Sequence, residues 1–119
     1  MAFDEYTAER ISNYLLSKNV SFETRKMMGG LCFMLNDKML CGILISKKTN
    51  GQLLIARIGE EAYTEALKKE NVLPMDFTGR PMRGCIFVQE EGIDLEDDLA
   101  GWMDLCLAFN PLAKSSKKK

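Results

Sequence analysis

The chain has 119 residues, of which 46% are hydrophobic and 28% are charged, and its formal net charge is −1. This size and balance indicate one globular domain and exclude a disordered or fibrous chain. The longest apolar runs are too short to cross a bilayer, and the acidic start, Met1 to Glu5, lacks the apolar core of a signal peptide. We therefore expect a cytoplasmic protein that does not enter the membrane.

Histidine is absent from the sequence, which removes the commonest general base and the commonest neutral metal ligand. The four cysteines form no Cys-x-x-Cys pair, and each has apolar neighbours: Cys32, Cys41, Cys85 and Cys106. We interpret them as buried free thiols, with redox sensing or a disulfide as the alternative. The sequence therefore predicts no catalytic site, no metal site and no cofactor.

The first predicted element is a helix over residues 4–18, with an apolar stripe along one side that includes Tyr6 and with Asp4 as its N-cap. Residues 23–35 follow and predict an extended strand. This strand is interrupted at Gly29-Gly30, where paired glycines indicate a bulge or the close approach of another backbone. The start of the chain is therefore expected to be one helix and one irregular strand.

Turn signals divide the next residues into two strands, over 39–46 and 52–58. A short helix is predicted over residues 59–69. Brief strands follow at 75–77 and 82–89. The tight turns between successive strands predict a mainly antiparallel sheet.

The last predicted element is a helix over residues 94–109, with Asp94 as a candidate N-cap. Acidic residues crowd around its start, and we interpret them as a solvated loop and helix cap. The complete order is α-β-β-β-α-β-β-α. The fold class is therefore an α+β domain.

Two elements carry more apolar surface than a single core requires. Residues 39–45 are apolar on both faces of the predicted strand, and the last helix has a broad apolar arc. A homodimer would cover this surface, with Trp102, Leu105 and Leu107 as candidate interface residues. Burial within the chain itself is the alternative.

The charge is distributed unevenly along the chain. Residues 110–119 predict a disordered tail with the only run of lysines, namely Lys114, Lys117, Lys118 and Lys119. Residues 1–109 form the predicted domain, and without the tail twelve basic residues face seventeen acidic ones. Because a body of this sign repels phosphate backbones, we expect direct nucleic-acid binding to be absent or weak and confined to the tail.

A candidate site for an anion or an acidic partner comes from basic residues near glycines and a turn. Its residues are Arg25, Lys26, Gly29, Gly30, Arg80 and Arg83. They form a site only if the strand that carries Arg25 lies near the turn that carries Arg80. Surface ion pairs with the many acidic residues are the alternative.

Residues 25–33, read as Arg-Lys-Met-Met-Gly-Gly-Leu-Cys-Phe, resemble the Arg-Lys-Met-Phe-Gly-Gly signature of the TfoX/Sxy N-terminal domain family. This family is named for bacterial competence regulators. Further matches are residues 76–82 and the final helix around Trp102, so the resemblance extends over about residues 3–109. Met28 replaces the phenylalanine that is usual in the family.

The resemblance implies a two-layer fold similar to that of secretion chaperones, dimerisation and no known catalytic activity. It favours a regulatory or protein-interaction domain that acts in transcription through a partner protein. The full-length regulators carry a second, helical domain, whereas this sequence continues into the lysine-rich tail, so the competence role stays open. The alternative is a small anion- or ligand-binding protein, or an enzyme, with an Arg/carboxylate site.

Overall fold

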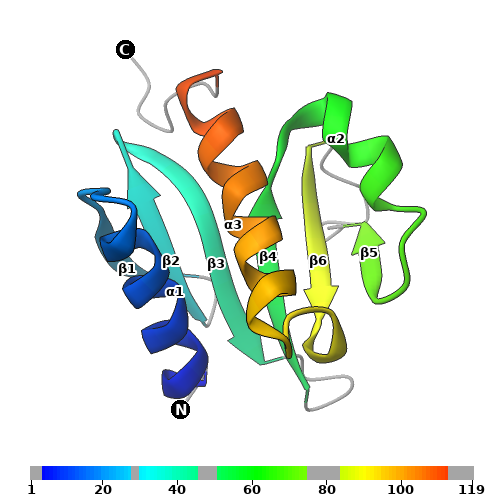
Figure 1. Ribbon diagram of the computed structural model, residues 1–119, viewed down its shortest axis with the longest axis horizontal. Coiled ribbons are helices and arrows are strands. Elements are labelled where there is room, and N and C mark those ends of the chain that lie inside the picture. The colour runs from blue at the N-terminus through cyan, green and yellow to red at the C-terminus, as the bar shows by residue number, and fades with distance from the viewer. Residues whose placement is uncertain (1–3, 28–29, 46–50, 75–83, 113–119) are drawn as a thin grey trace.

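The structure is a computed structural model that describes residues 4–27, 30–45, 51–74 and 84–112. In these described residues three helices pack on an antiparallel six-stranded sheet, which confirms the α+β class (Figure 1). The helices are α1 (Glu5–Ser17), α2 (Gly59–Ala66) and α3 (Glu96–Phe109). The strands are β1 (Glu23–Met27), β2 (Gly30–Leu35), β3 (Lys38–Ile45), β4 (Gln52–Arg57), β5 (Val72–Pro74) and β6 (Cys85–Gln89).

Four described strands precede α2, whereas the sequence predicted three. The strands lie in the order β1-β2-β3-β4-β6-β5. The predicted single strand over 23–35 is wrong, because β1 and β2 are antiparallel neighbours with Met27 opposite Gly30. The irregularity between β2 and β3 lies instead between Phe33 and Met34. The chain therefore reverses between Met27 and Gly30, where the sequence predicted one interrupted strand.

Gly30 confirms the other part of that prediction, the close approach of a second backbone. A Cβ atom at this position would lie 2.1 Å from the carbonyl oxygen of Ile43 and 2.8 Å from Cβ of Leu44. Both contacts are far shorter than van der Waals separation. The packing of β2 against β3 therefore requires glycine at this position.

The helix ends follow the predictions only in part. Asp4 is the N-cap of α1, and its carboxylate accepts hydrogen bonds from the backbone N–H groups of Tyr6 and Thr7. Leu95, and not Asp94, is the N-cap residue of α3, and its side chain makes no capping bond. Tyr6 was expected to face inward but is 70% exposed. Thr7 occupies the buried position instead.

The second half of the sheet also differs from its predicted bounds. β5 occupies Val72–Pro74, and the brief strand expected at 75–77 lies outside the described residues. β5 pairs with β6 at the edge of the sheet, so it follows β6 in the strand order although it precedes β6 in the chain. This arrangement brings the connection after α2 close to the loop that follows β6.

Two apolar clusters lie on opposite faces of the sheet. The main core packs residues of all three helices against one face and includes Cys41 and Ile43 of β3. The second cluster consists of strand residues alone, including Leu44 of β3 and Ile55 of β4. Leu44 and Ile55 are buried within the single chain, whereas Ile45 at the end of β3 is 36% exposed, so the chain itself covers most of both apolar faces of β3.

The folded part of the chain extends past the predicted boundary at residue 109. Asn110–Leu112 form a 3-10 turn, and Asn110 is buried. The Asn110 side-chain amide donates to the carbonyl of Leu35 at 3.2 Å and accepts a hydrogen bond from the Asn36 side chain at 3.3 Å. These bonds fasten the end of α3 to the β2–β3 turn. None of the helices in the described residues has the length and apolar character needed to span a bilayer.

Candidate interaction site

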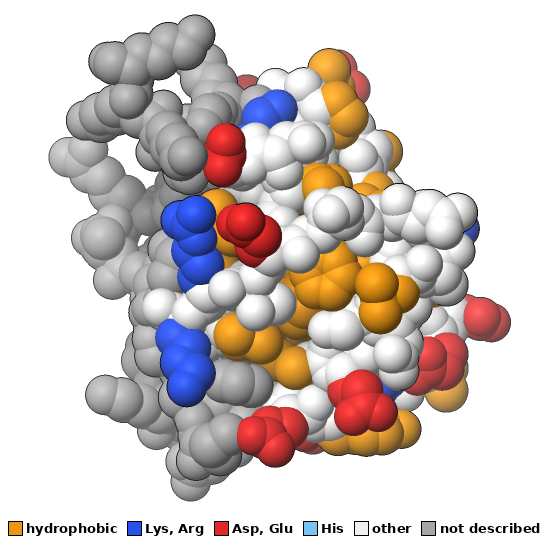
Figure 2. All heavy atoms as spheres, turned by 90° about the vertical axis from the view of Figure 1, so that its left-hand side faces the viewer, with side chains coloured by type: hydrophobic (Ala, Val, Ile, Leu, Met, Phe, Trp, Pro, Cys, Tyr) orange, Lys and Arg blue, Asp and Glu red, His pale blue; other side chains and the backbone are white. Residues whose placement is uncertain are grey.

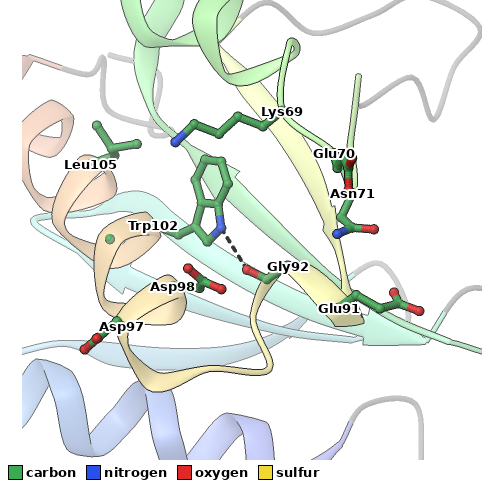
Figure 3. A pocket seen from close by; sticks show the side chains of 10 residues that line it. Lys69, Glu70, Asn71, Glu91, Gly92, Asp97, Asp98, Trp102 and Leu105 are labelled. Carbon is green, nitrogen blue, oxygen red and sulfur yellow. Dashed lines mark hydrogen bonds between the residues drawn. The ribbon is translucent and has the colours of Figure 1, made fainter.

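A surface hollow of about 290 Å³ lies where α3, the start of β5 and the 3-10 turn Glu90–Gly92 meet (Figure 3). We call it the Trp102 hollow. Its lining residues are Lys69, Glu70, Asn71, Glu91, Gly92, Asp97, Asp98, Gly101, Trp102 and Leu105. They come from three separate stretches of the chain, which are brought together by the pairing of β5 with β6.

Trp102 connects two of the elements that line the hollow. Its side chain is only 7% exposed, and the indole Nε1–H donates to the carbonyl of Gly92 at 3.1 Å. This bond satisfies the polar atom of a buried indole and fastens the turn after β6 to α3. The Lys69 side chain reaches across the indole, with its Nζ 5.2 Å from the ring centroid (Figure 3). At this separation the ammonium group is attracted to the ring by a cation–π interaction.

The charge around the hollow is mainly negative. Four lining residues carry carboxylates, namely Glu70, Glu91, Asp97 and Asp98, against the single ammonium of Lys69. The three ion pairs between described residues involve none of these carboxylates. Asp97 and Asp98 also lie in the first turn of α3, where the positive end of the helix dipole stabilises acidic residues. The hollow is therefore suited to positively charged groups.

Gly101 forms part of the wall of the hollow, on the exposed side of α3. Apart from its two chain neighbours and the backbone of its own helix, a Cβ atom at this position would meet no atom within 4 Å. Glycine inside a helix lowers stability by about 0.5–1 kcal/mol relative to alanine. Unlike Gly30, Gly101 has no described packing neighbour that requires glycine, so it leaves open space at the wall of the hollow at a cost in stability.

The predicted anion site is described only in part. Arg25 and Lys26 lie exposed on the edge strand β1, where Arg25 pairs with Cys32 and Lys26 with Leu31, so their side chains leave opposite faces of the sheet. Nη2 of Arg25 lies 3.8 Å from Oε1 of Glu23. Gly30 packs against the backbone of β3 and is therefore not open to a ligand. Gly29, Arg80 and Arg83 lie outside the described residues, so their convergence with Arg25 stays a prediction.

The three predicted dimer residues differ in exposure. Leu105 is 36% exposed at the rim of the Trp102 hollow. Leu107 is partly buried against the main core, and Trp102 is buried. Within a single chain, Leu105 is therefore the residue of this group that is most available to a second molecule.

The cysteines confirm the prediction of buried free thiols. Burial raises the pKa of the Cys106 thiol to about 12 and holds that of Cys41 well above its usual value. Such thiols are mostly protonated at neutral pH and react slowly. Among the described residues, no group of three or more Cys, Asp or Glu side chains is placed to hold a metal ion.

A polar seam joins α1 to α3, and the sequence did not predict it. The Arg10 guanidinium contacts the Glu96 carboxylate at 2.6 Å and donates to the carbonyl of Ile93 at 2.9 Å. Tyr14 donates a 2.5 Å hydrogen bond to the Asp104 carboxylate, and this bond raises the pKa of Tyr14 to about 12. The residue type at one position of an amphipathic helix does not show which distant residue it will contact, so the sequence could not predict these bonds.

The side of the molecule formed by α1 and β1 shows hydrophobic side chains with charged ones of both signs around them (Figure 2).

The fold and the hollow together define a small two-layer α+β domain with an acidic recess beside a buried aromatic side chain. The family model for the TfoX N-terminal domain matches residues 14–110. The chain therefore belongs to the TfoX N-terminal domain family and is a competence-regulator-like domain, as the Gly29-Gly30 signature predicted. The chain matches none of the curated proteins and none of the solved structures with which it was compared.

Proposed function

We propose that this chain is a regulatory domain of the cytoplasm that acts on transcription by binding a partner protein. Membership of the TfoX N-terminal domain family is the observation that carries this proposal. The Trp102 hollow adds a surface suited to protein contact, because binding sites are commonly concave and combine aromatic side chains with a polar rim. The acidic lining of the hollow favours a protein partner over DNA, because DNA is a polyanion.

Transcript measurements in the native cell test this proposal. A strain that lacks the gene should change the level of a defined set of transcripts by severalfold, and the intact gene should restore them. Purified protein should show no sequence-specific binding to the promoters of those transcripts, because a partner makes the DNA contact. Unchanged transcripts, or specific promoter binding by the purified chain alone, would contradict the proposal.

Self-association is a second part of the proposed function and depends mainly on Leu105. A symmetric dimer would cover this exposed leucine, and replacement of Leu105 and Leu107 by glutamate would place charges in the interface. Light scattering should report a dimer for the parent and a folded monomer for Leu105→Glu alone, because Leu105 is exposed whereas Leu107 packs partly against the main core. Thr64→Glu, at an exposed position on α2, is the control and should stay dimeric. A parent that is monomeric at high micromolar concentration would exclude the dimer.

The alternative function, an anion- or ligand-binding protein or an enzyme with an Arg/carboxylate site, gains no support from the described residues. Arg25 lies beside Glu23 on an exposed edge strand, and no second arginine is described near it. We therefore place the protein-interaction function first.

A further inference from the structure

We propose that the Trp102 hollow binds a lysine- or arginine-bearing segment of a partner protein, with one cationic side chain lying on the indole in place of Lys69. This inference rests on the proposed function and names the chemistry of the partner. Three observations carry it: the charge of the lining, the contact between Lys69 and Trp102, and the open space at Gly101.

The charge of the lining selects for cations. Glu70 and Glu91 line one side of the hollow and Asp97 and Asp98 line the α3 side; the Asp98 carboxylate lies near the indole, whereas those of Glu91 and Asp97 point outward (Figure 3). No ion pair between described residues compensates these four carboxylates, so negative charge gathers around one recess. A segment with several positive charges would neutralise it. The negative potential of the hollow would also speed the encounter with a basic partner.

Lys69 shows that a cation is stable against this ring. Its ammonium lies 5.2 Å from the centroid of the Trp102 indole and is supplied by an exposed, flexible side chain. An incoming lysine or arginine can make the same cation–π contact and reach the carboxylates as well. Lys69 can swing into solvent, because no ion pair between described residues holds it. The exchange replaces one cation–π contact by another and adds new charge pairs.

Gly101 points to a peptide in preference to a small cation. The carboxylates lie on separate elements, so a single small ammonium ion on the indole leaves most of them unpaired. A peptide presents several charges along its length, but its backbone must pass close to the wall of the hollow. The missing Cβ at Gly101 provides that room. The same space is otherwise unexplained by the packing of α3.

The test uses the full chain and a pentalysine peptide in buffer of about 20 mM salt, where charge contacts are weakly screened. Trp102 is the only tryptophan in the sequence, so its fluorescence reports the hollow directly. We expect saturable binding that weakens steeply with salt. Asp97→Asn with Asp98→Asn should weaken binding about tenfold, since each exposed charge pair contributes modestly.

The matched control is Glu60→Gln with Glu61→Gln. These acidic residues also lie in the first turn of a helix, α2, but outside the hollow. The control makes the same change in net charge and should weaken binding less than about twofold if the site is local. Equal loss in both double variants would show attraction to net charge alone and would overturn the proposal.

Two further variants separate binding from folding. Lys69→Ala should tighten peptide binding about threefold, because the indole is then free. Gly101→Ala should raise the melting temperature and yet weaken binding by about threefold or more, because its Cβ occupies the approach. Failure of the peptide to bind at millimolar concentration, or full affinity in Gly101→Ala, would overturn the proposal. Since only purified chain and peptide are used, such a failure leaves the transcript test unaffected, and the reverse also holds.

Discussion

The same substitution at two glycines should have opposite effects on stability. In Gly30→Ala, the new Cβ would lie 2.1 Å from the carbonyl oxygen of Ile43, so β2 and β3 must separate. A relaxed carbon–oxygen contact needs about 3.3 Å, which requires a shift of about 1 Å. A backbone hydrogen bond stretched by that amount is lost.

The size of the effect follows from the lost pairing and the added strain. One or two ladder bonds between β2 and β3 contribute about 1 kcal/mol each, and overpacking adds about 1–3 kcal/mol. We expect Gly30→Ala to lower the free energy of unfolding by about 3–4 kcal/mol, which is about 12–16 °C in melting temperature for a domain of this size. Gly101→Ala should raise it by about 1 kcal/mol, because its Cβ meets nothing within 4 Å.

Thermal unfolding followed by circular dichroism measures both variants against the parent. Urea unfolding with Trp102 fluorescence provides an independent free energy from the only tryptophan. A Gly30→Ala variant that melts within about 2 °C of the parent would refute the argument from backbone approach. A destabilised Gly101→Ala variant would show that its space is needed within the folded chain.

Three further predictions follow from the thiols, the titrating groups and the tail. The four buried cysteines should react slowly with a polar thiol reagent and fully in denaturant; rapid reaction of two or more in the folded state would contradict their burial. The pKa values of Cys106 and Tyr14 are each about 12 in the folded chain, above the unfolded values of 9.0 and 10.0. The folded chain therefore holds these two protons more tightly than the unfolded chain does, and the free energy of unfolding should fall as pH rises towards 12. Tyr14→Phe should remove the tyrosine part of that fall, and an unchanged pH profile would argue against the Asp104 hydrogen bond. Any nucleic-acid binding should be lost near 0.2 M salt and after removal of residues 113–119, with Asn110 kept because it is buried; specific binding that survives the truncation would contradict this.

Local patterns predicted the features that depend on near neighbours. The positions of the helices, the cap at Asp4 and the apolar surroundings of the cysteines are set within a few residues, and the structure confirms them, although Tyr6 of the predicted stripe is exposed. The double glycine was assigned to the right place but partly to the wrong feature. Chain reversal and a bulge use the same residues, and only the pairing of Met27 with Gly30 distinguishes them.

The sequence did not predict the arrangement of the acidic residues before and within α3. They were interpreted as a solvated cap, yet Glu91, Asp97 and Asp98 border one hollow with Trp102. The contact of Lys69 with the indole could not be predicted, because the two residues are far apart in the sequence. The sequence contained one indirect signal, a glycine inside an amphipathic helix beside its only tryptophan.

Sequence alone was sufficient for the α+β class, the family resemblance and the burial of the thiols, because these depend on composition, short motifs and the period of apolar residues. The tertiary structure decided the strand order, the need for glycine at Gly30 and the position of the Trp102 hollow. These features depend on pairing between distant segments: β5 adds to the edge of β6, which brings the end of the α2 connection beside α3. Such pairing results from burial of apolar faces across the whole chain, and local residue patterns do not record it.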